Sequence, residues 1–188
     1  EAIEAAAERR RVAYASGRQG ARRALARLGC EDVPLINDTD GVPHWPSDVV
    51  GSITHTDGLT AVAVAPVSRA LGIGIDIERV RNLDAGVAVR ILRPAERAWI
   101  DAQPPAERDR WTMLVFSAKE CVYKCIYPLE RKFLEFHDVQ IALEPQTCTF
   151  TAALIKESEY MPNDALETFS AGYTFDPPYI ITGVVLPA

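Results

Sequence analysis

Three acidic residues and one lysine are spaced so that they could do chemistry together. Asp76 and Glu78 stand two residues apart in the stretch GIGIDIER. Because side chains alternate between the two faces of a strand, both carboxylates would lie on the same face. Glu120 and Lys124 stand four residues apart in FSAKECVYK, which places them on one face of a helix. If the strand and the helix converge, the three carboxylates form an anionic cluster beside a cation.

Such a cluster favours a metal ion, because gathered carboxylates repel one another unless a cation lies between them. Oxygen ligands without His or Cys suit a hard cation such as Mg²⁺, which commonly takes substrate phosphate oxygens as its remaining ligands. Lys119 and Lys124, on either side of Glu120, could then bind those phosphates. The sequence therefore predicts a Mg²⁺ site at Asp76, Glu78 and Glu120.

A simpler explanation exists for each stretch. Asp76 and Glu78 could lie on the solvated face of an antiparallel strand, where acids are common. Glu120 and Lys124 could form a surface ion pair, which contributes only roughly 0.3–0.5 kcal/mol. The apolar residues on nearly all sides of the second pair argue for a buried helix, in which charges need partners.

Two further stretches carry groups suited to phosphate. GSITHTDG runs from a strand into a turn, so Thr54, His55 and backbone N–H groups could meet a phosphate there. The alternative is that Thr54 only caps the turn. The stretch RRRVAYASGRQGARRAL carries Arg11 and Arg18, whose guanidinium groups suit phosphate but could equally form a solvated basic face.

The elements that position these groups follow from hydrophobic periodicity. We expect helices at 2–28 (broken near Ser16-Gly17), 84–92, 94–102 and 107–127, and strands at 50–54, 59–65 and 71–78 and in DVQIAL, CTFTAAL, TFSAGYTF and YIITGVVL. This order indicates an α+β fold with helices against antiparallel sheet. We expect the boundary between two lobes just before or within the strand at 71–78.

Composition narrows the class of protein further. The chain has 188 residues, of which 48% are hydrophobic, and a net charge of −6, which argues against a broad nucleic-acid surface. Its longest apolar run, LTAVAVAPV, is too short to span a membrane, and its opening is unlike a signal peptide. Because the sequence does not begin with Met, we expect that the chain is trimmed or that its first segment is missing. Cys30, Cys121, Cys125 and Cys148 complete no zinc pattern, so we expect reduced packing residues in a cytoplasmic protein.

The motifs GSITH, GIGIDIE and WTMLVFSAKECVYK, in this order, resemble the signature of the phosphopantetheinyl transferases of the monomeric, surfactin-synthetase-activating type. GRQGARRALARLG, GVPHWP and YPLERKFLEFHDV resemble the neighbouring segments, so the resemblance covers roughly residues 9–143. It implies a pseudo-dimer of two similar α+β lobes, 1–70 and 71–188, each with an antiparallel sheet and a long helix. The active site would lie in the cleft between them, where the glycine-lined strand face would let a ligand approach.

The resemblance also implies a reaction. The 4′-phosphopantetheine arm of coenzyme A would pass to a serine hydroxyl of an acyl or peptidyl carrier protein, releasing adenosine 3′,5′-bisphosphate. By the same resemblance, Asp76, Glu78 and Glu120 would bind Mg²⁺, or Mn²⁺ in its place, and Glu120 would also be the general base. Lys119 and Lys124 would contact phosphates, with Lys124 at the diphosphate.

For the coenzyme itself, the resemblance implies contacts between its phosphates and Thr54 and His55. Arg18 matches an arginine near the adenosine 3′-phosphate, and Arg11 matches one less closely. Asn37 stands where some relatives have a lysine, which removes one cation from that region.

Two other functions compete with this one. The chain could be another Mg²⁺-dependent transferase or hydrolase acting on a nucleotide diphosphate, or a non-catalytic protein that binds coenzyme A or a carrier. A hydrolase would consume coenzyme A without a carrier, so dependence on a carrier separates the transfer reaction from this alternative. The intact set of three carboxylates argues against a non-catalytic binding protein. Carrier proteins are typically acidic, as is this chain, so docking would need a local basic or apolar patch. Arg131 and Lys132 are candidates, although a solvated loop explains them as well.

Overall fold

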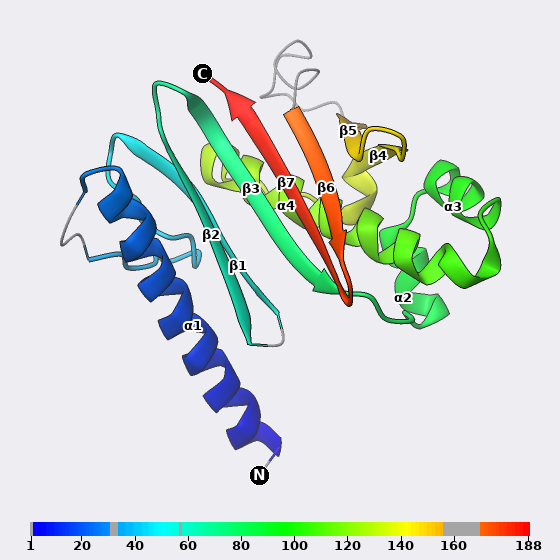
Figure 1. Cartoon of the computed structure of the whole chain (residues 1–188), viewed down its shortest axis with the longest axis horizontal. Coiled ribbons are helices and arrows are strands. Elements are labelled where there is room, and N and C mark those ends of the chain that lie inside the picture. The colour runs from blue at the N-terminus through cyan, green and yellow to red at the C-terminus, as the bar shows by residue number, and fades with distance from the viewer. Residues whose placement is uncertain (1, 31–33, 57, 156–169) are drawn as a thin grey trace.

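The computed structural model describes every residue except 1, 31–33, 57 and 156–169 (Figure 1). The elements are α1 (Ala2–Arg27), β1 (Val49–Thr56), β2 (Leu59–Pro66), β3 (Ala70–Arg79), α2 (Ala85–Ile91), α3 (Pro94–Asp101), α4 (Arg108–Glu130), β4 (Val139–Glu144), β5 (Thr149–Leu154), β6 (Ser170–Asp176) and β7 (Tyr179–Pro187), with short 3₁₀ turns at Pro105–Glu107 and Phe136–Asp138. β1 and β2 form an antiparallel hairpin, and the other strands form an antiparallel sheet in the order β3-β7-β6-β5-β4. The predicted α+β class with antiparallel sheets is confirmed.

The helix α1 lies along the β1–β2 hairpin and is continuous through Ser16 and Gly17, so the predicted break is wrong (Figure 1). A Cβ atom on Gly17 would lie 3.0 Å from the Ile53 side chain, and one on Gly20 would lie 3.0 Å from Val62. The glycines therefore serve close packing of the helix on the hairpin, not a bend. Within the described part of the chain, no helix is long and apolar enough to cross a membrane.

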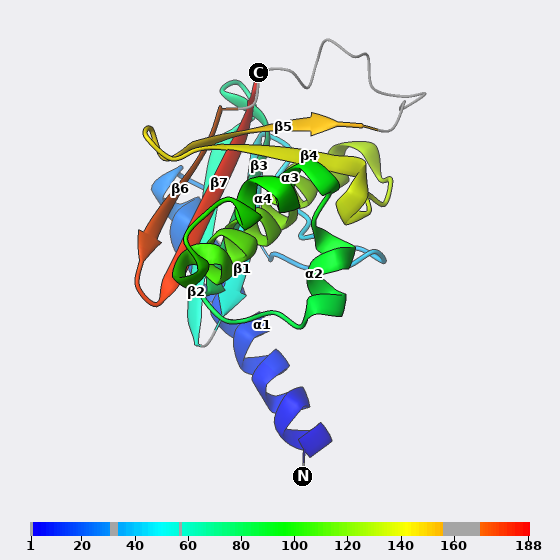
Figure 2. The same cartoon turned by 90° about the vertical axis from the view of Figure 1, so that its right-hand side faces the viewer.

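The helix α4 packs against β3 and β7 and supplies much of the buried core, while α2 and α3 lie beyond it, on the side away from the hairpin (Figures 1 and 2). It approaches β3 so closely that a Cβ atom on Gly74 would lie 1.8 Å from the Cys121 carbonyl oxygen. A Cβ atom on Gly72 would lie 2.8 Å from the Cys125 carbonyl oxygen. The expectation that a ligand approaches this glycine face is wrong, because a helix covers it.

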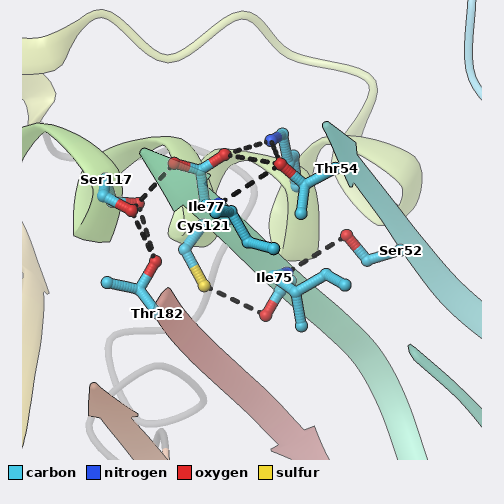
Figure 3. Close-up of polar contacts among 10 residues, drawn as sticks. Ser52, Thr54, Ile75, Ile77, Ser117, Cys121 and Thr182 are labelled. Atoms are coloured by element: carbon cyan, nitrogen blue, oxygen red, sulfur yellow. Dashed lines mark hydrogen bonds and ion pairs between the residues drawn. The ribbon is translucent and has the colours of Figure 1, made fainter. Parts of the chain in front are cut away.

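The hairpin and the larger sheet meet along β1 and β3, which lie side by side but belong to different sheets. Ser52 Oγ accepts a hydrogen bond from Ile75 N (3.1 Å), and Thr54 Oγ1 accepts one from Ile77 N (3.3 Å; Figure 3). We call these two contacts the hydroxyl seam. Side-chain oxygens of β1 thus bind β3 at positions where a neighbouring strand would offer carbonyl groups.

The two parts of the molecule differ in size within the described residues. One consists of α1 and a two-stranded hairpin, and the other of α4, two shorter helices and five strands. The predicted lobe boundary falls at the start of β3, and the likeness of the two lobes stays a prediction. Residues 168–169 of the predicted strand TFSAGYTF lie outside the described residues.

Candidate active site

Asp76 lies on β3, is only 3% exposed and contacts side chains of β1 and α4. Its Oδ1 atom accepts a hydrogen bond from Thr54 Oγ1 (3.0 Å) and lies 2.6 Å from Lys124 Nζ. Its Oδ2 atom accepts a hydrogen bond from Ser117 Oγ (2.8 Å). A buried carboxylate requires such partners, because an unpaired buried charge is costly. The sequence stretches 50–54, 71–78 and 107–127 are therefore brought together at this one side chain.

Ser117 and Thr182 are completely buried behind Asp76. The two hydroxyl oxygens lie 2.9 Å apart, and Thr182 Oγ1 donates to the Ser117 carbonyl oxygen (3.1 Å). Thr182 on β7 is also the cross-strand neighbour of Asp76. Sequence reasoning missed both residues. Ser117 stands inside the motif FSAKE and could have been suspected, but Thr182 becomes visible only from the strand register.

Glu78 and Glu120 are partly buried near Asp76. Burial, followed by the negative charge of Asp76, raises the pKa of Glu78 to about 7, and Glu120 adds to this effect. The pKa of Glu120 is also raised, mainly by burial, while the nearby Lys124 lowers it. The three carboxyl groups are thus close enough to influence one another, as expected for converging elements.

The three carboxyl groups present only oxygen donors, which suits Mg²⁺. Burial, and next to it the charge of Asp76, raises the pKa of Glu78 and of Glu120, so a cation beside these two groups would favour their charged forms. However, among the described residues no group of three Asp, Glu, His or Cys side chains is already arranged to hold a metal ion. The ammonium group of Lys124 lies against Asp76 instead. The types of donor atom suit a divalent cation, but their present arrangement does not form a metal site. The predicted metal site therefore stays a proposal.

Lys119 is buried on the other side of α4, with 1% of its side chain exposed. Its Nζ atom lies 2.8 Å from Glu96 Oε2 and donates to the carbonyl oxygens of Ile91 and Phe136, each at 2.8 Å. Burial lowers the pKa of Lys119, and the hydrogen bond and charge of Glu96 oppose this shift. An ammonium group has three hydrogens, and three acceptors inside the protein use them. This corrects the predicted phosphate contact of Lys119.

A cavity of about 400 Å³ lies beside Asp76, between α1, the segment before β1, β1 itself and α4. It is lined by Arg10, Ala13, Tyr14, Gly17, Arg18, Asn37, Asp40, Gly41, Val42, Pro43, Trp45, Gly51, Ser52, Ile53, His55, Tyr123, Lys124, Tyr127 and Pro128. Three of the predicted ligand-binding residues, Arg18, His55 and Lys124, therefore share one cavity. They come from three elements that are distant in the sequence.

Arg18 is held in place within this cavity of about 400 Å³, the smaller of two adjoining cavities. Its guanidinium group lies 4.4 Å from the centre of the Tyr14 ring and donates a hydrogen bond to Asn37 Oδ1. Its Nε atom is buried and has no hydrogen-bond partner among the residues that the structure describes. Asn37, which the resemblance marked as a departure, is thus the residue that orients this arginine.

Two other predicted contacts are placed differently. Thr54 is 3% exposed, and its hydroxyl is used by Asp76 and by the hydroxyl seam, so it supports the site from behind instead of facing a phosphate. Arg11 lies on the exposed side of α1, and its Nη1 atom lies 3.9 Å from Glu8 Oε2. Arg11 does not line the cavity. Arg10 lines it instead, because successive residues of a helix point in different directions.

A second cavity, of about 670 Å³, adjoins the first at Tyr123, which lines both. It is lined by Arg90, Lys119, Glu120, Tyr123, Phe133, Leu134, Glu135, Phe136, His137 and Val139. Aromatic and aliphatic side chains form much of its wall, and Glu120 is one of its charged lining residues. Neither Tyr123 nor Phe133 could be singled out from the sequence, because Tyr123 is one of many apolar residues within α4 and Phe133 is an exposed aromatic residue after that helix.

Arg131 ends α4 in a left-handed conformation with φ 55°. Its guanidinium group donates to Asp38 and lies 3.5 Å from Asp40, two acidic residues of the segment before β1. The hydrogen bond from Arg131 lowers the pKa of Asp38. Arg131 therefore connects α4 to a segment that lines the smaller cavity, and its role in docking a carrier stays a prediction.

Comparison with known proteins identifies the family. Residues 1–65 match the family model of the 4′-phosphopantetheinyl transferase N-terminal domain, and residues 72–164 match that of the 4′-phosphopantetheinyl transferase superfamily. The 4′-phosphopantetheinyl transferase Svp of Streptomyces mobaraensis is 36% identical over 93% of this chain and 72% of its own. The chain belongs to the 4′-phosphopantetheinyl transferase superfamily. The family resemblance that the sequence motifs predicted is confirmed.

Other relatives of this phosphopantetheinyl transferase agree. The 4′-phosphopantetheinyl transferase PptT of Mycobacterium tuberculosis is 31% identical over 95% of this chain and 80% of its own. Among solved structures, the holo-ACP-synthase from Plasmodium yoelii matches with a TM-score of 0.50 and 17% identity, over 63% of this chain and 95% of that one. This second likeness concerns the fold alone.

Proposed function

We propose that this chain transfers the 4′-phosphopantetheine group of coenzyme A to a serine hydroxyl of an acyl or peptidyl carrier protein, releasing adenosine 3′,5′-bisphosphate. Membership of the superfamily makes it a phosphopantetheinyl transferase. One observation carries the site assignment. Asp76, Glu120 and Lys124 meet where a cavity with cationic groups adjoins a cavity with an apolar wall.

The two cavities suit the two ends of coenzyme A. In the smaller one, Arg18, His55 and Lys124 would bind the phosphates of the nucleotide end, and the unpartnered Nε of Arg18 supports this role. In the larger one, Tyr123 and Phe133 would contact the pantetheine arm, which is mostly uncharged. The diphosphate would then lie between the cavities, next to Glu120 and Lys124.

Asp76, Glu78 and Glu120 would hold Mg²⁺, or Mn²⁺ in its place. When bound, the ion would neutralise negative charge that develops on the diphosphate. Support for this assignment comes from the oxygen donor set and from the burial of Glu78 and Glu120, which raises the pKa of both groups and would make a cation beside them favourable. Thr54 and Ser117 would hold Asp76 in position through their hydrogen bonds.

Glu120 would accept the proton of the carrier serine while the serine oxygen attacks the phosphorus atom that bears the pantetheine arm. The bond between that phosphorus and the bridging oxygen breaks, and adenosine 3′,5′-bisphosphate leaves. The raised pKa of Glu120 makes it a better base than an ordinary glutamate. Lys124 would stabilise the negative charge of the leaving group through its ammonium group.

The test is incubation with coenzyme A, Mg²⁺ and several apo carrier proteins, read by the intact mass of each carrier. We expect a carrier to gain one phosphopantetheine group only when coenzyme A and metal are both present, with a chelator as the control. Consumption of coenzyme A without any carrier would instead identify a hydrolase. Binding of coenzyme A with no reaction on any carrier would support the non-catalytic alternative.

A further inference from the structure

Glu96 and Lys119 form an ion pair that is almost fully buried, with 0% and 1% of their side chains exposed. Neither residue belongs to the carboxylate cluster around Asp76. The pair nevertheless lies next to it in the chain, because Lys119 directly precedes Glu120. Lys119 also lines the larger cavity. A buried ion pair is not required for stability, since apolar residues often replace such pairs without loss.

The pair is fully satisfied by hydrogen bonds. Glu96 Oε1 accepts from Ile141 N, and Glu96 Oε2 accepts from Arg93 N, each at 2.7 Å. Lys119 donates to Ile91 O and to Phe136 O. The pair thus connects α4 to the end of α2, the start of α3, the start of β4 and the 3₁₀ turn Phe136–Asp138.

The hydrogen bond from Lys119 Nζ to the Phe136 carbonyl oxygen connects the ion pair to the larger cavity. The segment 133–137, which we call the wall segment, lines the larger cavity, and its first part has no regular secondary structure. Arg93 donates a second hydrogen bond to this segment, at the carbonyl oxygen of His137, and the rings of Phe116 and Phe136 lie 5.6 Å apart. Polar contacts from α3 and α4 therefore hold the backbone of an otherwise irregular segment.

We propose that Glu96 and Lys119 are positioning residues that fix the wall segment for binding of the pantetheine arm. This proposal rests on the proposed function, because it assigns the larger cavity to that arm. Lys119 acts through the backbone of Phe136 and does not contact the phosphates. Glu96 holds Lys119 in the orientation that this contact needs.

Loss of the ion pair should weaken binding of the pantetheine arm and leave binding of the nucleotide end of coenzyme A unchanged. The smaller cavity contains neither Glu96 nor Lys119, and the wall segment does not line it. A loosened wall would have to be ordered again when the arm binds, which costs affinity. The KM for coenzyme A should therefore rise more than kcat falls.

The double variant Glu96→Gln/Lys119→Met tests this, because it removes both charges and leaves no lone buried ion. Calorimetry compares coenzyme A with adenosine 3′-phosphate 5′-diphosphate, which carries every phosphate but lacks the arm. We expect affinity for coenzyme A to fall about tenfold and affinity for the armless nucleotide to stay unchanged. Amide hydrogen exchange should accelerate at 133–137. Asp101→Asn, which removes a surface pair with Arg97 on α3, is the matched control and should change neither readout.

Equal loss of affinity for both ligands would overturn the proposal, because it would mean that Lys119 contributes to phosphate binding. Unchanged hydrogen exchange in the wall segment of the folded variant would overturn it as well. If the double variant fails to fold, Glu96→Gln alone is measured in the same way, because glutamine keeps an acceptor oxygen. The exchange measurement needs no substrate, whereas carrier modification by the unchanged protein tests the proposed function separately.

Discussion

Asp76 has a hydroxyl donor at each of its two oxygens and the ammonium of Lys124 at one of them. Its position is thus fixed by the protein before any metal ion or substrate binds. Glu120 has no such set of partners in the part of the chain that the structure describes, and burial raises its pKa. We therefore propose different roles for the two carboxylates, with Asp76 held in place for its charge and Glu120 available to accept a proton.

The first prediction compares Asp76→Asn with Glu120→Gln, since both amides remove one negative charge and keep nearly the same shape. If Glu120 takes the serine proton, Glu120→Gln should stay about 10²–10⁴-fold slow at saturating Mg²⁺ and coenzyme A. Asp76→Asn should recover more of its activity as Mg²⁺ is raised. The measurement is the rate of carrier modification against Mg²⁺ concentration. Equal recovery of the two variants would remove the role of base from Glu120.

The cysteines allow a second prediction at this scale. Burial raises the pKa of Cys125 to about 12 and that of Cys121 still further, whereas Cys148 is exposed. Only the thiolate reacts with alkylating reagents, so at pH 8 Cys148 should be labelled first and Cys121 and Cys125 only on unfolding. Peptide mapping after timed treatment with iodoacetamide measures this. Early labelling of Cys121 would contradict the tight contact between β3 and α4.

At the scale of elements, that contact depends on the absence of a side chain at Gly74. We predict that Gly74→Ala destabilises the protein by about 3 kcal/mol or more, because its Cβ would overlap the Cys121 carbonyl and force β3 and α4 apart. Gly183→Ala, on the neighbouring strand β7, is the matched control. No atom of the described residues lies within 4 Å of the added Cβ there, so the substitution should change the free energy of unfolding by no more than about 1 kcal/mol. Urea unfolding of both variants provides the measurement.

The element boundaries could largely be predicted from the sequence, and their partners could not. The helix predicted at 94–102 appears as Pro94–Asp101, because proline is favoured in the first turn and fixes the start. By contrast, Gly17 was interpreted as a helix break, although it serves close packing against β1. Local periodicity reports which side of an element is apolar. It does not report which element covers that side.

Some residues of the candidate site could likewise be predicted from the sequence, and others could not. Asp76, Glu120 and Lys124 could be found from their types and spacing, because charges inside apolar stretches are unusual. The true partners of Lys119 could not, since Glu96 lies one helix earlier and the other two acceptors are backbone carbonyls, which leave no mark in the sequence. Thr54 was likewise placed at the ligand, and only the approach of β1 to β3 shows that its hydroxyl faces Asp76.

At the scale of the whole molecule, Arg131 connects the end of α4 to Asp38 in the segment before β1. Asp38 also accepts hydrogen bonds from the backbone N–H groups of Asp40 and Val42, so it organises that segment. We predict that Arg131→Asn leaves unfolding nearly unchanged, because the pair is at the surface and asparagine tolerates the left-handed conformation. Affinity for coenzyme A should fall, since the segment lines the smaller cavity. Calorimetry measures this, with Arg97→Gln as the control.

The same connection predicts a pH dependence. The hydrogen bond from Arg131 holds the pKa of Asp38 below its usual value of 3.8. A carboxyl group with a lowered pKa stabilises the folded state above the unfolded pKa, and this contribution is lost as the pH falls through the folded value. The protection of amide hydrogens at 38–44, measured relative to the intrinsic exchange rate at each pH, should therefore fall on acidification below about pH 4. In Arg131→Asn this fall should be smaller, and an identical response in both proteins would contradict the connection.

The hydroxyl seam also bears on how the chain behaves when it is concentrated. A bare strand edge is a template on which another molecule can add a strand, and this is a common route to aggregation. β3 is the last strand in the order β3-β7-β6-β5-β4, so its outer edge has no backbone neighbour within its own sheet. Ser52 and Thr54 occupy two of its N–H groups and keep β1 over that edge. Loss of the Ser52 hydroxyl should therefore appear as turbidity of a concentrated solution, whereas loss of the Thr54 hydroxyl should also disturb Asp76.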